Sequence, residues 1–239
     1  MNLEDYEKKV FSQNGEDGIT IKLIDMIYGE FKNFRNFVEF GVEDGVQCNT
    51  RILREKFGWK GLSMDGSHEN KQIFLKKEFI TKENIVSLFK KYNVPEKIDL
   101  LSVDIDFNDF YVLNEILNNY TCDIIICEYN SIHLPNQDKI IIYKSDGSWD
   151  FTNYFGASLL SLEKLANKYN YSLVYCDKKG VNCFFVHNDK IKEKNLQFKN
   201  FGCIEKIYRH PNYGYGPYEG HPDDKLNRKY ITFEEAINL

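Results

Sequence analysis

The feature that most constrains this chain is a regular alternation between short apolar runs and segments with helical spacing. The apolar runs lack the polar alternation of a half-exposed strand, as is typical of strands that are buried on both faces. The predicted strands of this part are 36–40, 61–65, 78–81, 98–104 and 123–128. The predicted helices are 18–27, 50–57, 68–77, 84–92, 109–117 and 157–169. This order predicts a mostly parallel sheet that is covered by helices on both faces.

Two further strands are predicted at 171–176 and 181–186, and only Asp177–Gly180 separates them. A link this short cannot hold the crossover that parallel strands need, so the pair must form an antiparallel hairpin. The fold class is therefore α/β: a doubly wound, Rossmann-like, mostly parallel seven-stranded sheet with a terminal antiparallel hairpin. This arrangement is similar to that of class I methyltransferases, whereas a dinucleotide-binding dehydrogenase normally continues with parallel strands.

Length and composition restrict the class further. The 239 residues suffice for one large domain, which we place at 1–189, while periodicity is lost in a C-terminal extension at 190–239. A net charge of −5 means that the chain as a whole has no excess of basic residues for binding nucleic acid.

No signal-peptide pattern follows Met1 and no long apolar run is present, so we expect a cytoplasmic protein without membrane insertion. The six cysteines form no CxxC pair and are expected to be reduced core residues.

A glycine-containing turn follows the first strand, where open α/β sheets bind ligands. Glu39 lies near the carboxyl end of that strand, and Gly41 and Gly45 allow the backbone to approach a ligand closely, although they can also serve a tight turn alone. Asp65 ends the second strand, where a carboxylate accepts the ribose hydroxyls of a nucleoside cofactor, unless it is only a solvated turn residue. Carboxylates in the turn disfavour a pyrophosphate and suit the sulfonium cation of S-adenosylmethionine.

Acidic residues also follow the fourth and fifth strands, whose ends meet at one edge of the sheet. Asp104, Asp106, Glu128 and Asn130 offer hard oxygen ligands for Mg²⁺ or Mn²⁺, and His133 adds an imidazole. Asp104 is expected to contact the cofactor as well and to act in catalysis by helping to hold an ion on the acceptor oxygen. The alternative is a helix cap and acceptor pocket without metal, in which His133 is the first choice for general base.

Four stretches of the sequence together resemble the FkbM-like methyltransferases, a class I family that uses S-adenosylmethionine mostly for O-methylation of natural products and surface glycans. The stretches are 11–18, 38–45, 101–109 and 180–186. The resemblance implies that Gln13 and Glu16 lie near the amino-acid tail of the cofactor; a helix-capping turn is the alternative. It also implies that Glu83 and Asn84 lie near the adenine.

The resemblance predicts an O-methyltransferase for a small acceptor, namely a sugar hydroxyl or phosphoryl-type oxygen of a bacterial capsule or surface-glycan precursor. A nicotinamide-dependent oxidoreductase and a non-catalytic cofactor-binding scaffold are the rival interpretations. The segment 210–222 is rich in Gly, Pro and Tyr. It is expected either to cover the acceptor as a lid or to be a disordered or homodimer-forming tail.

Overall fold

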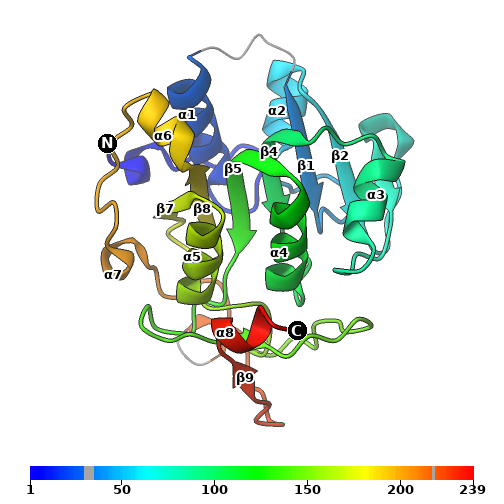
Figure 1. Cartoon of the computed structure of the whole chain (residues 1–239), viewed down its shortest axis with the longest axis vertical. Helices are drawn as coiled ribbons and strands as arrows, with labels where there is room; N and C mark the ends of the chain where they lie inside the picture. The colour runs from blue at the N-terminus through cyan, green and yellow to red at the C-terminus, as the bar shows by residue number, and fades with distance from the viewer. Residues whose placement is uncertain (30–34, 217–218) are drawn as a thin grey trace.

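A computed structural model describes residues 1–29, 35–216 and 219–239 and is built on one seven-stranded sheet (Figure 1). The strand order is β3-β2-β1-β4-β5-β8-β7. The strands are β1 Asn36–Phe40, β2 Lys60–Asp65, β3 Leu75–Lys77, β4 Lys97–Val103, β5 Thr121–Glu128, β7 Tyr171–Cys176 and β8 Asn182–His187. β8 runs antiparallel to both of its neighbours, and the other pairs are parallel. The predicted fold class and the terminal hairpin are confirmed.

Helices cover both faces of the sheet. The helices are α1 Glu16–Tyr28, α2 Arg51–Phe57, α3 Ile85–Lys91, α4 Asp109–Asn119, α5 Leu159–Lys168, α6 Asn188–Glu193, α7 Ile204–Ile207 and α8 Phe233–Ala236, with 3-10 turns η1 Leu3–Tyr6 and η2 Lys71–Ile73. Helices α3, α4 and α5 share one apolar cluster with the sheet, and α1 and α2 share the other. Figure 1 shows these two layers on either side of the strands. Among the described residues, no helix is long and apolar enough to cross a membrane.

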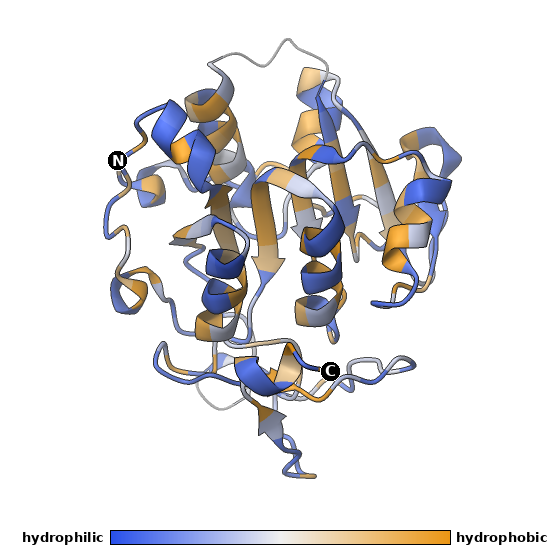
Figure 2. Cartoon of the chain, viewed as in Figure 1, coloured by the Kyte–Doolittle hydropathy of each residue, from blue (hydrophilic) through white to orange (hydrophobic). Residues whose placement is uncertain are grey.

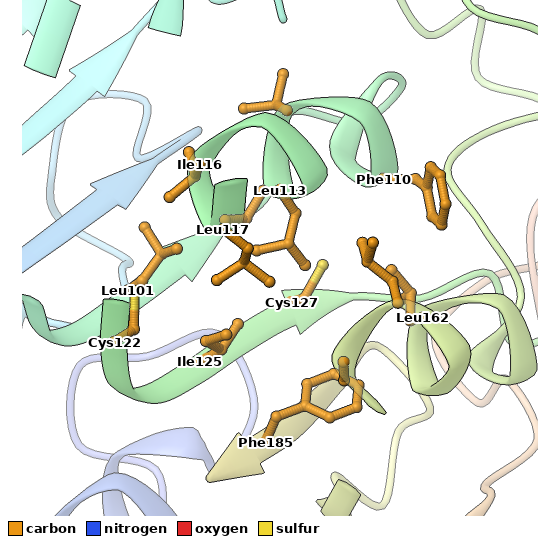
Figure 3. Packing of buried hydrophobic residues seen from close by; sticks show 14 of the residues in the cluster. Leu101, Phe110, Leu113, Ile116, Leu117, Cys122, Ile125, Cys127, Leu162 and Phe185 are labelled. Carbon is orange, nitrogen blue, oxygen red and sulfur yellow. The ribbon is translucent and has the colours of Figure 1, made fainter. Parts of the chain in front are cut away.

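The layering follows from the pleat of buried strands, which sends successive side chains to opposite faces. Phe37 lies in the cluster under α1 and α2, while its neighbour Val38 lies in the cluster under α3 to α5. The central strands β4 and β5 are accordingly apolar over most of their length (Figure 2). Figure 3 shows Leu113 and Leu117 of α4 directed onto Ile125 of β5. Each such buried side chain contributes about 1.5–3 kcal/mol, so the sheet centre is a rigid base for its edges.

The segment between β2 and α3 differs from the prediction. The expected helix at 68–77 is only the short turn η2, and the third strand is Leu75–Lys77 rather than 78–81. Leu75 is fully buried and pairs in register with Ser63 of β2. The spacing of apolar residues in 68–77 was misleading, because pairing with the exposed edge of β2 outweighs the weak helical preference of these residues.

The C-terminal extension is folded onto the carboxyl ends of the strands. Its strand β9, Tyr230–Ile231, pairs with β6, Ile140–Ile141, which lies between the predicted strand 123–128 and the predicted helix 157–169, where no strand was expected. The ring of Phe233 in α8 packs at 6.1 Å from that of Phe110 in α4. Figure 1 shows α8 and β9 beyond the arrowheads of the central strands, so the extension closes the edge where a ligand would enter.

Candidate active site

A cavity of about 560 Å³ lies at the carboxyl ends of β1, β2, β4 and β5. Its position is the one at which open α/β sheets bind ligands. The lining residues are Gln13, Asn14, Glu39, Phe40, Gly41, Glu43, Gln47, Cys48, Asn49, Asp65, Asp104, Asp106, Glu128, Trp149, Lys179, Val181, Asn182, Asn212, Tyr213 and His221. Six of these are carboxylic acids and one is a lysine, so the cavity favours a cation or a neutral molecule over an anion.

The glycines of the turn after β1 are required by the backbone. Gly41 has a φ of 65°, and a Cβ at this position would lie 1.7 Å from the carbonyl oxygen of Asp104. Gly45 has a φ of 79°, and a Cβ there would lie 2.4 Å from Ile73 Cδ1. Both conformations favour glycine. The absence of a side chain at Gly41 brings the ends of β1 and β4 together, so the turn and Asp104 share one cavity.

Glu39 is 2% exposed and its carboxylate holds the start of α2. It accepts hydrogen bonds from the backbone N–H of Asn49 at 2.6 Å, from the backbone N–H of Thr50 at 3.0 Å and from the Thr50 hydroxyl. Burial raises its pKa, and the hydrogen bonds from Thr50 and Asn49 oppose that rise. Glu39 therefore lines the cavity, where it was predicted, but its oxygens already fix the loop that carries Asn49.

Asp65 is 8% exposed and also lines the cavity. Its Oδ1 accepts from the N–H of Ser67 at 2.8 Å, from the Ser67 hydroxyl at 2.7 Å and from the N–H of His68 at 3.1 Å. Burial alone would raise its pKa, but these hydrogen bonds outweigh it and lower the pKa. Oδ2 accepts from Glu43 N–H at 2.9 Å, its one partner among the described residues, so it retains a lone pair for a further donor.

The residues just before and at the start of α1 have two roles: some line the cavity, and others hold the loop in place. Gln13 and Asn14 line the cavity, whereas Glu16 is fully buried beneath them. The Glu16 carboxylate accepts from the N–H of Asn14 at 2.9 Å and from the N–H of Gly15 at 2.8 Å. It also accepts from Asn182 Nδ2 at 3.0 Å, which ties the loop to β8. Of the two residues predicted here, Gln13 reaches the cavity, and Glu16 positions the loop.

Glu83 and Asn84 are not among the lining residues. Glu83 accepts a hydrogen bond from the hydroxyl of Tyr143. Asn84 joins the ends of its own turn, because its Oδ1 accepts from Thr81 N–H at 2.8 Å and its Nδ2 donates to the Phe79 carbonyl at 2.8 Å. The structure thus places both residues away from the site where an adenine was expected, since the shift of β3 toward residue 75 also shifts the loop that follows it.

The carboxyl groups after β4 and β5 converge as predicted. One oxygen from each of Asp104, Asp106 and Glu128 lies within 4.8 Å of the other two. Burial raises the pKa of Asp104 and Glu128 well above their usual values, and mutual repulsion adds to the rise. Oε2 of Glu128 is buried without a hydrogen-bond partner among the described residues. Such a cluster is stable only when protons or a cation neutralise it.

Asn130 and His133 do not join this cluster. Asn130 is fully buried, and its Nδ2 donates to the carbonyls of Asn153 at 2.8 Å and Phe155 at 3.0 Å. His133 is 3% exposed, packs at 4.6 Å from the ring of Tyr230, and does not line the cavity. Burial lowers its pKa to about 3. The expectation that His133 borders the reacting atoms is therefore corrected: its loop turns toward the core and the extension covers it.

The structure adds lining residues that were not named individually as site residues from the sequence, although two of them lie in the segment 210–222 that was expected either to cover the acceptor or to form a tail. Trp149 comes from the segment after β6, and Tyr213 and His221 come from the extension. The extension reaches the cavity because Gly180, with a φ of 72°, leaves room for the carbonyl of His210, which would lie 2.5 Å from a Cβ. The abundance of Gly and Tyr in 210–222 was a signal for this wall. Pro217 and Tyr218 of that segment lie outside the described residues.

No protein-family model and no curated protein sequence matches the chain. Solved structures similar to it include an O-methyltransferase family protein from Burkholderia thailandensis, with 7% identity and a TM-score of 0.40 over 72% of this chain and 57% of that chain. The METTL16 methyltransferase domain matches at 8% identity with a TM-score of 0.39, over 70% of this chain and 79% of that chain. A Haemonchus contortus phosphoethanolamine N-methyltransferase matches at 12% identity with a TM-score of 0.33, over 71% of this chain and 44% of that chain. The fold class rests on this chain's own strand order.

Proposed function

We propose that the chain is a methyltransferase that uses S-adenosylmethionine to methylate an oxygen of a small acceptor. The observation that supports this most is the acidic cavity formed by the glycine turn and the ends of β2, β4 and β5. A pyrophosphate cofactor would meet six carboxyl groups there, and a sulfonium cofactor would be attracted by them. The cofactor carries its methyl group on a positively charged sulfur, which is already a good leaving group.

The side chains of this chain would bind and align the cofactor. The open lone pair of Asp65 Oδ2 is suited to a ribose hydroxyl, because its pKa is lowered and it stays ionised. The close approach of Gly41 to Asp104 leaves the backbone of the turn accessible to the cofactor. Gln13 and Asn14 offer amide groups for a carboxylate and an ammonium at the same cavity. Alignment is the main contribution that the protein has to make to a direct displacement.

A divalent ion fits the cluster of Asp104, Asp106 and Glu128. The fit rests on the donor set, three carboxylates within 4.8 Å, and on the unpartnered Oε2 of Glu128. Mg²⁺ and Mn²⁺ accept such hard oxygen ligands and keep positions free for water or a substrate oxygen. When bound, the ion would lower the pKa of an acceptor hydroxyl. Asn130 and His133 are no longer part of the proposed ligand set, because both lie outside the cavity.

The narrower assignment, to the FkbM-like family and to a capsule or surface-glycan precursor, is supported by the resemblance of the four sequence stretches. All four stretches contribute to the cavity, through Gln13, Gly41, Asp104 and Asn182 respectively. A sugar hydroxyl and a phosphoryl-type oxygen are the acceptor groups that this assignment suggests. A cytoplasmic location and a homodimer belong to the same proposal.

Calorimetry with S-adenosylhomocysteine and with NAD tests the proposal. We expect binding of the first, with an increase in melting temperature by linkage, and no binding of NAD at equal concentration. Asp65→Asn should weaken S-adenosylhomocysteine binding by about 1–3 kcal/mol, because a charged acceptor is lost. Asp44→Asn is the control, since among the described residues its carboxylate accepts one local hydrogen bond, from Val46 N–H at 3.0 Å, and it is not one of the residues that line the cavity. Binding of NAD alone would overturn the proposal in favour of an oxidoreductase.

A further inference from the structure

One part of the cavity wall is aromatic and is formed by segments far apart in the sequence. The ring of His221 lies 4.5 Å from that of Trp149 and 5.0 Å from that of Tyr213, measured between centroids. Phe155 packs on the same histidine at 5.5 Å. Trp149 Nε1 donates to the Thr152 carbonyl at 2.7 Å, so the indole is held in place. The imidazole is therefore fixed by ring contacts on several sides.

His221 is in a state that suits proton transfer. It is the one histidine among the lining residues that the structure describes. Burial lowers its pKa, so the ring is neutral at pH 7 and can accept a proton. Neither ring nitrogen has a hydrogen-bond partner within the described ranges, although the ring itself is positioned by its aromatic neighbours. A base held by ring contacts, with a free nitrogen in a cavity, is available to a ligand.

The charges of the cavity restrict what this wall can bind. Its acids are Glu39, Glu43, Asp65, Asp104, Asp106 and Glu128. Lys179 is the one lysine or arginine among the described lining residues, and its Nζ lies 3.4 Å from Asn212 Oδ1. These acids would repel a phosphate monoester, and among the described lining side chains Lys179 is the one permanent cation that could offset its charge. A neutral polyhydroxyl ring avoids this repulsion, since aromatic side chains cover its apolar face and carboxylates accept from its hydroxyls.

We propose that His221 is the catalytic base and that the acceptor is an uncharged polyhydroxyl compound, such as a glycoside, held against Trp149 and Tyr213. This rests on the proposed function. The acceptor hydroxyl gives its proton to a ring nitrogen of His221, and an oxygen lone pair forms the bond to the methyl carbon of S-adenosylmethionine. The carbon–sulfur bond breaks with its electron pair on sulfur, which becomes a neutral thioether.

The test uses the full-length protein, S-adenosylmethionine and neutral methyl hexopyranosides (gluco, galacto and manno) as acceptor probes, with hexose 6-phosphates for comparison. Formation of S-adenosylhomocysteine is measured with and without Mg²⁺. We expect turnover with at least one neutral glycoside and less with the phosphates. His221→Ala should lower kcat by about 100-fold or more and should regain activity with added imidazole. His221→Gln should lose the decline in rate that the wild type shows at acidic pH, where its base becomes protonated; because burial lowers the pKa of His221, this decline should lie at a lower pH than for an exposed histidine.

His210→Gln is the matched control. His210 lies in the same extension, but its Nδ1 contacts the Tyr208 hydroxyl at 3.2 Å and it does not line the cavity. Calorimetry with S-adenosylhomocysteine distinguishes a failure of the methyltransferase proposal from a failure of the proposed acceptor class and base. If the wild type fails to bind it, the methyltransferase proposal fails. If it binds but no neutral glycoside is methylated, or if His221→Ala keeps kcat within about threefold without imidazole, then the assignment of acceptor class and base is overturned.

Discussion

Two glycines with almost the same backbone conformation show how surroundings decide the role of a residue. Gly41 has a φ of 65° and Gly58 a φ of 67°, but a Cβ would meet the Asp104 carbonyl at 1.7 Å in the first case and nothing within 4 Å in the second. Gly58 ends α2 as a left-handed cap. Gly41 brings two strand ends together at the cavity. Backbone conformation alone would predict the same cost for a side chain at either position. The contact with the Asp104 carbonyl makes a side chain at Gly41 the more costly of the two.

Gly41→Ala should therefore lower the free energy of unfolding by at least about 3 kcal/mol, because backbone atoms must move in addition to the strain of a positive φ. Gly58→Ala should lower it by only about 1–2 kcal/mol, the cost of the left-handed conformation itself. Urea unfolding of both variants measures the difference. Equal losses would mean that β1 and β4 tolerate a wider separation at Gly41 than the structure shows.

At the scale of elements, the β7–β8 hairpin contains a buried acid in its turn. Asp177 is fully buried and its Oδ1 accepts from Lys179 N–H at 2.7 Å, while Oδ2 accepts from the N–H groups of Val181 and Asn182. Burial raises its pKa to about 7, and the charge of Glu16 adds to the rise. These hydrogen bonds close the turn, and their acceptor is an acid that favours its protonated form.

Because the pKa of Asp177 is higher in the folded state than in the unfolded chain, the free energy of unfolding should fall as the pH rises. The folded state holds a proton on Asp177 up to about pH 7, whereas the unfolded chain releases it near the ordinary aspartate pKa of 3.8. Stability from this group is thus complete below about pH 4 and is lost as the pH rises toward 7, by roughly 1.4 kcal/mol per unit. We expect the urea midpoint to fall over this window, and Asp177→Asn to flatten the slope. An identical slope in the variant would show that another acid is responsible.

The carboxyl cluster at the ends of β4 and β5 is expected to bind a divalent ion. Mg²⁺ or Mn²⁺ should raise the melting temperature of the wild type, because it replaces the protons that Asp104 and Glu128 otherwise need. Asp104→Asn and Glu128→Gln should abolish this increase, and EDTA should suppress turnover. Asp44→Asn, whose carboxylate is outside the cluster, should keep the increase. A wild type that is insensitive to these ions and fully active in EDTA would rule out the metal.

At the scale of the whole molecule, the extension completes both the core and the cavity. The Tyr129 hydroxyl donates to the Arg209 carbonyl at 2.8 Å, and the Tyr208 hydroxyl donates to the Ser131 carbonyl at 2.6 Å. Phe233 is only 9% exposed and belongs to the apolar cluster of α3 to α5. Segments that carry Tyr213 and His221 are thereby anchored on both sides. The extension is a part of the domain in this structure.

Phe233→Ala should consequently lower the free energy of unfolding by about 3–4 kcal/mol, because it leaves a cavity between α4 and α8. Leu226→Ala is the control in the same extension: Leu226 is 74% exposed, and its loss should change stability by less than about 0.5 kcal/mol. Thermal or urea unfolding measures both. If Phe233→Ala unfolds like the wild type, the extension is held less firmly than its contacts indicate.

The sequence by itself determined most of the strands of the main sheet, its terminal hairpin and the position of the glycine turn after β1. Continuous apolar runs such as 98–104 and 123–128 can be stable only when both faces are covered, and Asp177–Gly180 is too short for anything but a hairpin. The convergence of Asp104 with Glu128 also followed, because the carboxyl ends of neighbouring parallel strands meet at one edge. These conclusions depend on local pattern and on rules of chain connection.

Only the tertiary structure decided which side chains face the cavity. Glu16, Glu83 and His133 have the chemistry of site residues, but two of them support loops and the third is packed against Tyr230. Conversely, nothing in the local sequence marks Trp149, and His221 reaches the cavity only because a long extension folds back over the sheet. Local periodicity reports that a side chain is buried or exposed, whereas its neighbours depend on packing between distant segments.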